Sequence, residues 1–363
     1  MRFWDLPGPR SFLDEVEGQL RNNKNLIIAL PTPSPPGFMN AFRDQLELSW
    51  LDLFLLEALP GQRPIDLLFE QLSIDIAPTE KPSPQSFVQN LKSGQVIIVD
   101  GVFRDMWEDW WNFISEYELL SREIVAVDRP LLVCIVSGVE ETILPRGAVA
   151  LSTNVWKGVL SELDMLTYAG ARIRSRGLES AHFRLVATTV ARIAQWDVSI
   201  ADVLLDSEDK DLFSPQMILK ELAQTYGWMK GARASWENGI VDYFDGREQI
   251  HSAFLALNDP YDELNMRVWS SQASTLLPMI ELHRRKLVLK IQHKLKMPLQ
   301  VGDERISDPL DLEIGILSHV AGICRVDPKI CAKLRKLKHI RNALAHLEVL
   351  KPEMALDQDI LLL

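Results

Sequence analysis

Three residues near the carboxyl end of the chain have side chains that can act together on a phosphate group. Arg341, Asn342 and His346 occur in the run RNALAH. A guanidinium group presents a fixed fork of N–H donors to phosphate oxygens, and an imidazole exchanges a proton near neutral pH. On a helix, Asn342 and His346 lie one turn apart and share a face. These residue types can bind a phosphate and move a proton beside it.

A second region has the position of a phosphate-binding loop without its chemistry. Such a loop follows a strand, has the form GxxxxGK[ST] and opens a helix. Here the run NLIIAL leads into PTPSPPGFM and then a helical pattern. If Gly37 is the second glycine, Thr32 replaces the first, Phe38 replaces the lysine and Met39 replaces the hydroxyl residue. Within this aligned loop, Pro33, Pro35 and Pro36 also lack N–H donors. We therefore expect no nucleotide and no metal cofactor.

Two polar residues follow later apolar runs. Asp100 ends the run QVIIVD, where a P-loop enzyme keeps a magnesium-binding carboxylate. Gly101 comes next, so no catalytic glutamate is adjacent to it. Ser137 ends the run LLVCIVS, roughly where a nucleotide-sensing residue would stand. For Asp100 the sequence favours a solvated strand-end or helix-capping residue over a magnesium ligand.

The elements that must position these residues differ between the two halves of the chain. Apolar runs without alternation are typical of strands covered on both faces, and they occur at 25–31, 95–101, 129–138 and 147–154. Helical patterns lie before and between them, at 10–23, 37–46, 64–73, 84–93 and 105–121. Residues 49–56 fit a fifth strand or a helix, and 31–36 and 77–84 are expected to be loops. The alternation predicts a doubly wound α/β domain with a mostly parallel sheet over residues 1–155.

From residue 156 to 363 the pattern predicts an all-α domain. Its longest helix is expected from Tyr261 to about Leu295, with a kink at Pro278. A last long helix is expected to begin at Asp327-Pro328, since Asp caps a helix and Pro fits its first turn.

Over residues 25–155, the order and spacing of the elements resemble the STAND/AAA branch of P-loop ATPases in an inactivated form. The resemblance implies a degenerate P-loop NTPase-like domain, and the loop from Thr32 to Met39 is where the chain departs from the family. Two alternatives stay open. One is an unrelated doubly wound domain with a proline-rich loop, and the other is an ATPase that still binds ATP through an unusual loop.

The R-N-x-x-x-H pattern within LRKLKHIRNALAHLEVL resembles the HEPN family of small helical domains, which often act as metal-independent ribonucleases. The resemblance implies that Arg341 holds the scissile phosphate and that His346 acts on the 2′-hydroxyl or the leaving group, with Asn342 orienting the site. It also implies a cleft formed across a homodimer. The alternative is a structural trio that joins two helices through buried hydrogen bonds.

The composition of the chain limits the kinds of partner that its surface can attract. The chain of 363 residues has a net charge of −11 and an isoelectric point of about 5.2, which disfavours nucleic acid and anionic membranes as partners of the whole surface. Three dispersed cysteines, and the lack of a signal peptide or a long uncharged apolar run, predict a cytoplasmic protein that does not enter a membrane. The C-terminal helices are locally basic and could attract RNA.

Together these features predict a non-hydrolysing STAND-like sensor or adaptor fused to a HEPN-like helical domain. By resemblance, such a protein would belong to a prokaryotic antiphage-defence or stress-response system and bind protein partners. The resemblance also allows it to be an RNA-cleaving effector. The alternative is a scaffold subunit that has no catalytic activity.

Overall fold

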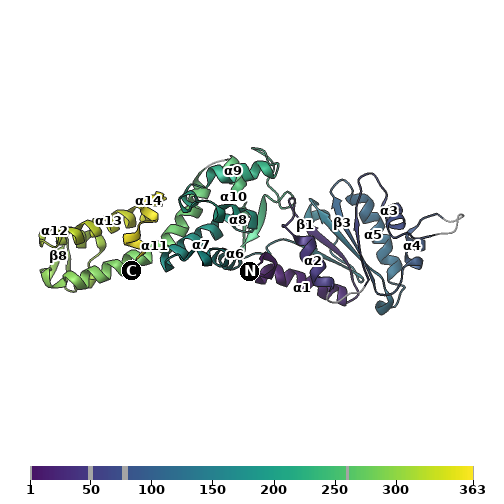
Figure 1. Cartoon of the computed structure of the whole chain (residues 1–363), viewed down its shortest axis with the longest axis horizontal. Coiled ribbons are helices and arrows are strands. Elements are labelled where there is room, and N and C mark those ends of the chain that lie inside the picture. Colours follow the sequence, from purple (N-terminus) through teal and green to yellow (C-terminus); the bar gives the residue numbers. More distant parts are fainter. Residues whose placement is uncertain (1, 48–51, 76–80, 259–260, 363) are drawn as a thin grey trace. The chain divides into compact units, whose positions relative to one another are not determined.

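The structure is a computed structural model that describes residues 2–47, 52–75, 81–258 and 261–362. The chain forms two compact units (Figure 1). The first unit comprises Met1–Asp164 and Gly231–His251, and the second comprises Met165–Lys230 and Ser252–Leu363. The first unit thus extends past residue 155 and includes a later segment, 231–251, that the sequence did not assign to it.

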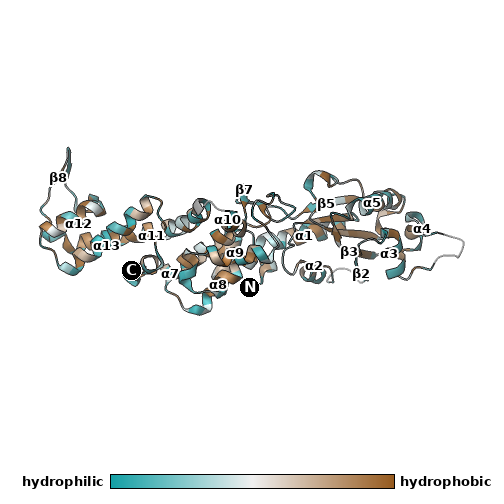
Figure 2. Cartoon of the chain, turned by 90° about the horizontal axis from the view of Figure 1, so that it is seen from above, coloured by the Kyte–Doolittle hydropathy of each residue, from teal (hydrophilic) through white to brown (hydrophobic). Residues whose placement is uncertain are grey.

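A parallel sheet of five strands forms the centre of the first unit. In sheet order the strands are β2 (Asp52–Glu57), β3 (Gln95–Phe103), β4 (Leu131–Ser137), β1 (Asn25–Leu30) and β5 (Leu151–Val155). All residues of β1 and β4 are buried, and Figure 2 shows the apolar character of the sheet. The predicted α/β domain with a parallel sheet is therefore confirmed. Residues 52–57 form a strand and not a helix, while 48–51 lie outside the described residues.

Strand β3 differs from its prediction at its carboxyl end. Its pairing with β4 shifts register between Val99 and Val102, and the strand then continues to Phe103. Asp100 therefore lies in a bulge within β3, and the prediction that Asp100 ends this strand is wrong. A bulge inserts an extra residue and re-aims the side chains beside it. Gly101 adopts φ +78° there, a conformation that glycine accepts at low cost.

Helices surround the sheet: α1 (Pro7–Arg21), α2 (Phe38–Glu47), α3 (Pro64–Gln71), α4 (Pro84–Asn90) and α5 (Trp107–Ser121). Helix α5 contributes Trp110, Phe113 and Tyr117 to the core. Phe113 and Tyr117 meet Phe87 of α4, and Trp110 packs against Phe113. The loop predicted at 77–84 lies partly outside the described residues, and α4 begins at Pro84.

The second unit is mainly helical. Helix α6 (Glu162–Ile173) leads into it from the first unit. The other helices are α7 (Ser180–Ala194), α8 (Val198–Asp206), α9 (Gln216–Thr225), α10 (Ser252–Asn258), α11 (Tyr261–Ile291), α12 (Ile314–Ile323), α13 (Pro328–Ala345), α14 (Pro352–Ala355) and α15 (Gln358–Leu361). Asp327 caps α13 by accepting the N–H of Lys329 at 2.7 Å, as the sequence predicted. Pro278 lies inside α11, which continues to Ile291.

The prediction of an all-α domain after residue 155 needs correction. Strand β5 ends at Val155, and two short antiparallel hairpins follow. One hairpin, β6 (Val241–Phe244) with β7 (Arg247–Ile250), belongs to the first unit. The other, β8 (Leu299–Val301) with β9 (Glu304–Ile306), belongs to the second. Strands of three or four residues are too short to leave a periodic pattern in the sequence.

Candidate functional site

Phe38, which stands where a phosphate loop would carry its lysine, is buried in an aromatic cluster. Its side chain is 3% exposed. The Phe38 ring lies 5.7 Å from the rings of Trp4 and Phe42, between centroids. Trp156 packs against Trp4 and Phe12 at 5.2 and 5.0 Å. The position expected to hold a cation for phosphate is therefore part of the hydrophobic core.

The backbone of the loop 31–37 is bonded by the chain itself. The N–H of Thr32 donates to the carbonyl of Glu237 at 2.9 Å. The indole N–H of Trp4 donates to the carbonyl of Pro36 at 3.0 Å. The hydroxyls of Ser34 and Ser137 are 3.3 Å apart, so the loop does meet the end of β4. At Thr32, the amide that could have faced a phosphate is already used.

The segment 231–251 returns to the first unit and contacts this loop closely. A Cβ atom on Gly239 would lie 3.1 Å from the carbonyl oxygen of Thr32, and one on Gly138 would lie 3.0 Å from the Thr32 hydroxyl. The buried Trp236 donates its indole N–H to the carbonyl of Trp156 at 2.9 Å. Thr32 is thus held between two glycines that leave no room for side chains.

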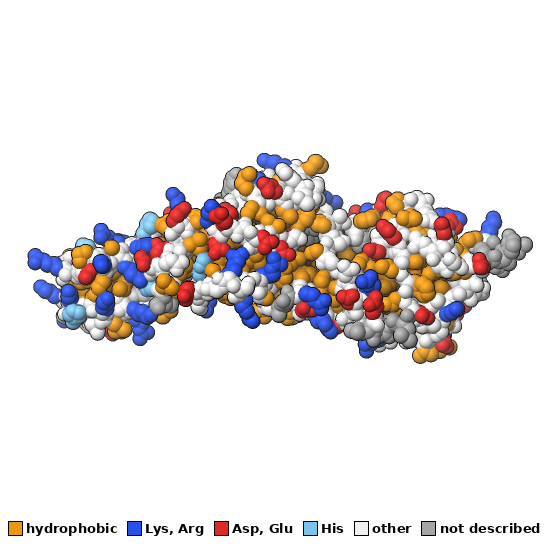
Figure 3. Space-filling view, viewed as in Figure 1, with side chains coloured by type: hydrophobic (Ala, Val, Ile, Leu, Met, Phe, Trp, Pro, Cys, Tyr) orange, Lys and Arg blue, Asp and Glu red, His pale blue; other side chains and the backbone are white. Residues whose placement is uncertain are grey.

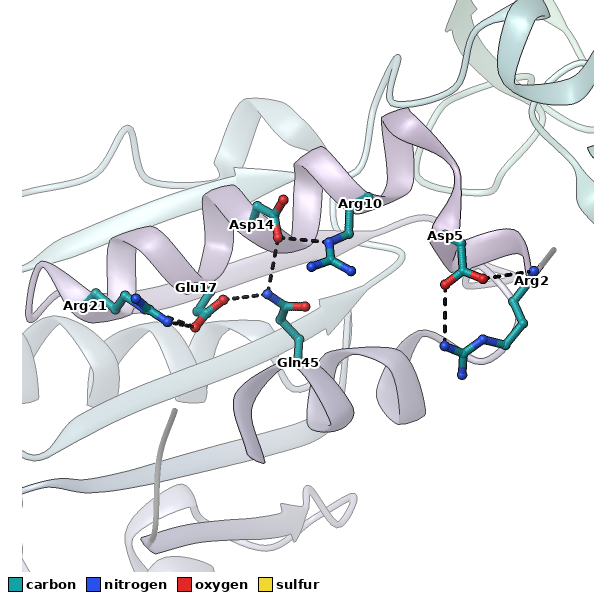
Figure 4. A network of polar contacts seen from close by, with 7 residues as sticks. All are labelled: Arg2, Asp5, Arg10, Asp14, Glu17, Arg21 and Gln45. Atoms are coloured by element: carbon teal, nitrogen blue, oxygen red, sulfur yellow. Dashed lines mark hydrogen bonds and ion pairs between the residues drawn. The ribbon is translucent and has the colours of Figure 1, made fainter. Parts of the chain in front are cut away.

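A polar network fixes α2 to α1 on the outside of this cluster (Figure 4). The amide of Gln45 on α2 donates to Asp14 at 3.2 Å and also to Glu17 on α1. Glu17 in turn pairs with Arg21 at 2.6 Å, and Asp14 with Arg10 at 3.2 Å. These bonds hold the helix that carries Phe38.

A cavity of about 360 Å³ lies beside the loop, between the start of α1 and α2. Its lining includes Arg2 and Arg10 together with Asp5 and Asp44. Both arginines are paired with carboxylates, Arg2 with Asp5 and Arg10 with Asp14. The cavity therefore presents a balanced set of charges and does not concentrate positive charge for a triphosphate.

Asp100 lies on β3, and β4 separates β3 from the loop-bearing β1. Its carboxylate accepts the N–H of Gly101 at 2.8 Å. Burial raises the pKa of Asp100, and the nearby charge of Glu57, its register partner on β2, raises it further. Among the described residues, no group of three or more His, Cys, Asp or Glu side chains is arranged to hold a metal ion.

The R-N-x-x-x-H residues lie at the carboxyl end of α13, where Arg341 and Asn342 belong to the helix and His346 is its C-cap. Arg341 bonds Asn342 at 3.1 Å and pairs with Glu313 at 3.2 Å. His346 is the exposed residue that caps the carboxyl end of the helix. Five positions on a helix place two side chains about 140° apart in projection, so Arg341 and His346 leave the helix on different sides. Asn342 and His346 share a side, as the sequence predicted.

A cavity of about 500 Å³ beside Arg341 carries more negative than positive charge. Three carboxylates line it, those of Glu281, Asp311 and Glu313, against the guanidinium groups of Arg284 and Arg341. Arg284 also donates to the carbonyls of Leu310 and Leu312 at 2.6 and 2.8 Å. His346 is not part of this lining. Such a cavity is poorly suited to a phosphate.

The sequence did not reveal a clasp that joins α11 to the C-terminal segment. Buried Gln272 donates to the carbonyl of Leu350 at 3.0 Å and accepts its N–H at 2.8 Å. Trp269 donates to the carbonyl of Leu344 at 2.8 Å. Gln272 stands between Val268 and Leu276 at four-residue spacings, and a polar residue in such an apolar stripe was the available signal.

His283 completes this clasp from the next turns of α11. Its Nε2 lies 2.8 Å from the carbonyl oxygen of Ile360, so the neutral ring must carry its proton on Nε2 to donate. Burial lowers the pKa of His283. The residue therefore stabilises the C-terminal segment in its neutral form.

The sequence matches no family model. In the part of the chain that the structure describes, none of the helices has the length and apolar character required to cross a bilayer.

Proposed function

We propose that this chain is a non-hydrolysing STAND-like adaptor that binds protein partners and performs no nucleotide chemistry. The observation that carries the proposal is the burial of Phe38 in the aromatic cluster with Trp4 and Phe42. An active loop needs a mobile cation and free N–H groups at this place. Core side chains at the start of α2 stabilise the domain and leave no room for a ligand.

The surroundings of the loop support the same proposal. In open α/β sheets, ligands bind beyond the carboxyl ends of the strands. The loop 31–37 follows β1 at such an end, and Ser137 follows from the neighbouring β4. The loop therefore lies where ligands bind in such sheets, but the buried side chain of Phe38 occupies the space that a ligand would need. By the resemblance given above, the adaptor would serve a prokaryotic defence or stress-response system.

The first test is calorimetric titration of the full chain with ATP and with ADP, each with magnesium, alongside an assay of released phosphate. We expect neither binding heat nor phosphate. Binding at micromolar concentration would overturn the proposal, because the loop would then have to open and expel Phe38.

The second test addresses the partner. The chain is co-expressed with the products of neighbouring genes, and the mass of any complex is measured by light scattering after size exclusion. We expect a complex whose mass is the same with and without ATP. A complex that forms only with ATP would contradict a nucleotide-independent adaptor.

RNA cleavage by a homodimer is the second candidate function, and the exposure of His346 beside Asn342 favours it. Arg341 would have to exchange its exposed ion pair with Glu313 for the phosphate, or a partner copy would supply the phosphate-binding group. RNA incubated with the wild type and with His346→Ala tests this candidate. Cleavage by the wild type alone would support it, and intact RNA in both samples, with and without partner proteins, would exclude it.

A further inference from the structure

Positive charge is concentrated in one part of the second unit. Residues 284–346 contain fourteen Lys and Arg and six Asp and Glu, a net charge of +8 in a chain whose total is −11. This range covers the end of α11, the hairpin β8–β9, and helices α12 and α13. In Figure 3, Lys and Arg side chains gather over these elements at the left of the view. The acidic total of the chain hides a strongly basic region.

Lysines on two antiparallel helices contribute to this region side by side. Trp269 near the start of α11 bonds Leu344 at the end of α13. Further along α11, Ile280 lines one cavity with Arg341. Continuing in this direction, Lys286 of α11 and Lys333 of α13 come close enough that their charges both act on the ring of His283.

One helical turn further along each helix stand Lys290 and Lys329, which are exposed. We call Lys286, Lys290, Lys329 and Lys333 the basic face. The two lysines on each helix are about 6 Å apart along its axis, four residues at 1.5 Å each.

Most of these cations have no internal counter-ion. Arg284, Lys336 and Arg341 take part in ion pairs, with Glu281, Asp357 and Glu313 among their partners. Within the described residues, the other eleven Lys and Arg of the range 284–346, including the whole basic face, have no carboxylate within 4 Å. Unpaired cations held close together repel one another, so an external polyanion would relieve that repulsion.

We propose that the basic face binds the phosphodiester backbone of nucleic acid without reading its sequence. Cations at regular intervals along two helices match a polymer that repeats a negative charge, and each neutralised phosphate releases counter-ions. A membrane surface would require a free apolar side on the helices. Here Val288, Ile291, Leu334 and Leu337 are buried in the unit. Leu282 and Leu289 of α11 are exposed, but they are single residues and do not form a continuous apolar side. The inference does not depend on the proposed adaptor function.

Fluorescence anisotropy tests the proposal with the full chain and labelled 20-mers: single-stranded RNA, single-stranded DNA and duplex DNA. The test variant carries Lys286→Gln, Lys290→Gln, Lys329→Gln and Lys333→Gln. We expect wild-type binding to all three probes that weakens with salt, and at least about tenfold weaker binding by the variant near 100 mM salt. For single strands, the slope of log affinity against log salt should become shallower by about 3 units, since each lysine contributes about 0.7. If the protein binds the RNA probe or the DNA probes more tightly, that preference identifies which nucleic acid the basic face binds.

A matched control removes the same charge elsewhere: Lys81→Gln, Lys92→Gln, Lys220→Gln and Lys230→Gln. It should keep most of the wild-type affinity. Lys336→Gln should also change little, because Lys336 is already paired with Asp357. Melting temperatures verify that each variant is folded, and the two-lysine variants Lys286→Gln/Lys290→Gln and Lys329→Gln/Lys333→Gln should each show part of the loss.

Three results would overturn the proposal. The first is equal binding by the wild type and the four-lysine variant, and the second is an equal loss in the matched control. The third is wild-type binding to phosphatidylserine vesicles or to polyglutamate without binding to any oligonucleotide, which would assign the basic face to a membrane or to an acidic protein.

Discussion

The loop after β1 and the carboxyl end of α13 are incomplete in opposite ways. The loop follows the carboxyl end of a parallel strand, where ligands bind in open α/β sheets, but the helix after it begins with the buried Phe38. At α13, Arg341, Asn342 and His346 have the side chains for chemistry on RNA, but Arg341 faces carboxylates and His346 faces solvent. A functional site needs both the shape and the side chains, and each of these regions supplies one of them.

Replacing Phe38 by lysine should have the largest effect and would test the first half of this comparison. Phe38→Lys restores the residue type of a phosphate loop but places a charge in the aromatic cluster. We expect a loss of stability of at least about 3–5 kcal/mol, the range for deleting a buried Phe side chain, and no gain of ATP binding. Urea denaturation measures the loss of stability, and titration calorimetry measures ATP binding. Met39→Lys, at a partly exposed site, is the control and should cost much less; ATP binding by Phe38→Lys would show that the lysine alone was missing.

The clasp of the second unit should be the next most sensitive feature. Gln272→Ala leaves the buried N–H and carbonyl of Leu350 without partners, and each unsatisfied group costs about 1–3 kcal/mol. We expect a loss of about 2–4 kcal/mol in urea denaturation and faster amide exchange over residues 347–361. Gln292→Ala, at an exposed position, should change neither. Unchanged exchange in Gln272→Ala would mean that other contacts hold the segment.

The two units should respond to pH in opposite directions, beginning with Asp242 in the first unit. Burial raises the pKa of Asp242 from 3.8 to about 7, although its Oδ1 accepts the N–H groups of Gly158 and Tyr243. A carboxyl group whose pKa is raised by folding stabilises the folded state at pH values below its pKa in the unfolded chain. This stability is lost as the pH rises through its pKa in the folded protein. Asp242→Asn should therefore melt higher than the wild type at pH 8, with a smaller difference at pH 5. The exposed Asp44→Asn should show no such change with pH; a difference independent of pH in Asp242→Asn would contradict the buried carboxyl as its cause.

His283 in the second unit should give the smallest effect, with the opposite sign. Burial lowers its pKa below the ordinary 6.5. A histidine whose pKa is lowered by folding stabilises the folded state at pH values above its pKa in the unfolded chain. This stability is lost as the pH falls through its pKa in the folded protein. The wild type should therefore lose stability relative to His283→Gln between pH 7 and pH 5, measured by urea denaturation at each pH. The exposed His293→Gln is the control. If the free energy of unfolding changed equally with pH in the wild type and in His283→Gln, the titration of His283 would not explain the loss of stability.

Local patterns predicted the sheet well because buried parallel strands leave continuous apolar runs. The runs around β1, β3, β4 and β5 all became strands. The bulge at Asp100 could not be predicted, since it depends on how β3 pairs with β4. The return of residues 231–251 was also not predictable, because Trp236 and Gly239 are explained by contacts with Trp156 and Thr32, which are far away in the sequence.

The residue types of the candidate site can be read from the sequence, whereas its geometry depends on contacts between distant segments. The sequence shows Phe38 where the resemblance would place the lysine of a phosphate loop, but the burial of Phe38 depends on Trp4 from a different segment. Helical spacing placed Asn342 and His346 on one side correctly. The carboxylate that engages Arg341 comes from Glu313, 28 positions earlier in the chain, and no local pattern pairs the two.

The separation of Trp236–Gly239 from the rest of the first unit has a consequence for synthesis. The chain emerges in order, so the loop after β1 waits for its contact with Glu237 until residues Met165–Lys230 have been made. At roughly 5–20 residues per second, this delay lasts roughly 3–13 seconds on the ribosome. During that interval the carbonyl of Trp156 lacks the indole N–H of Trp236 that bonds it in the folded unit, and a chaperone could bind the incomplete domain. A gene fragment that ends at residue 164 would make this transient state permanent.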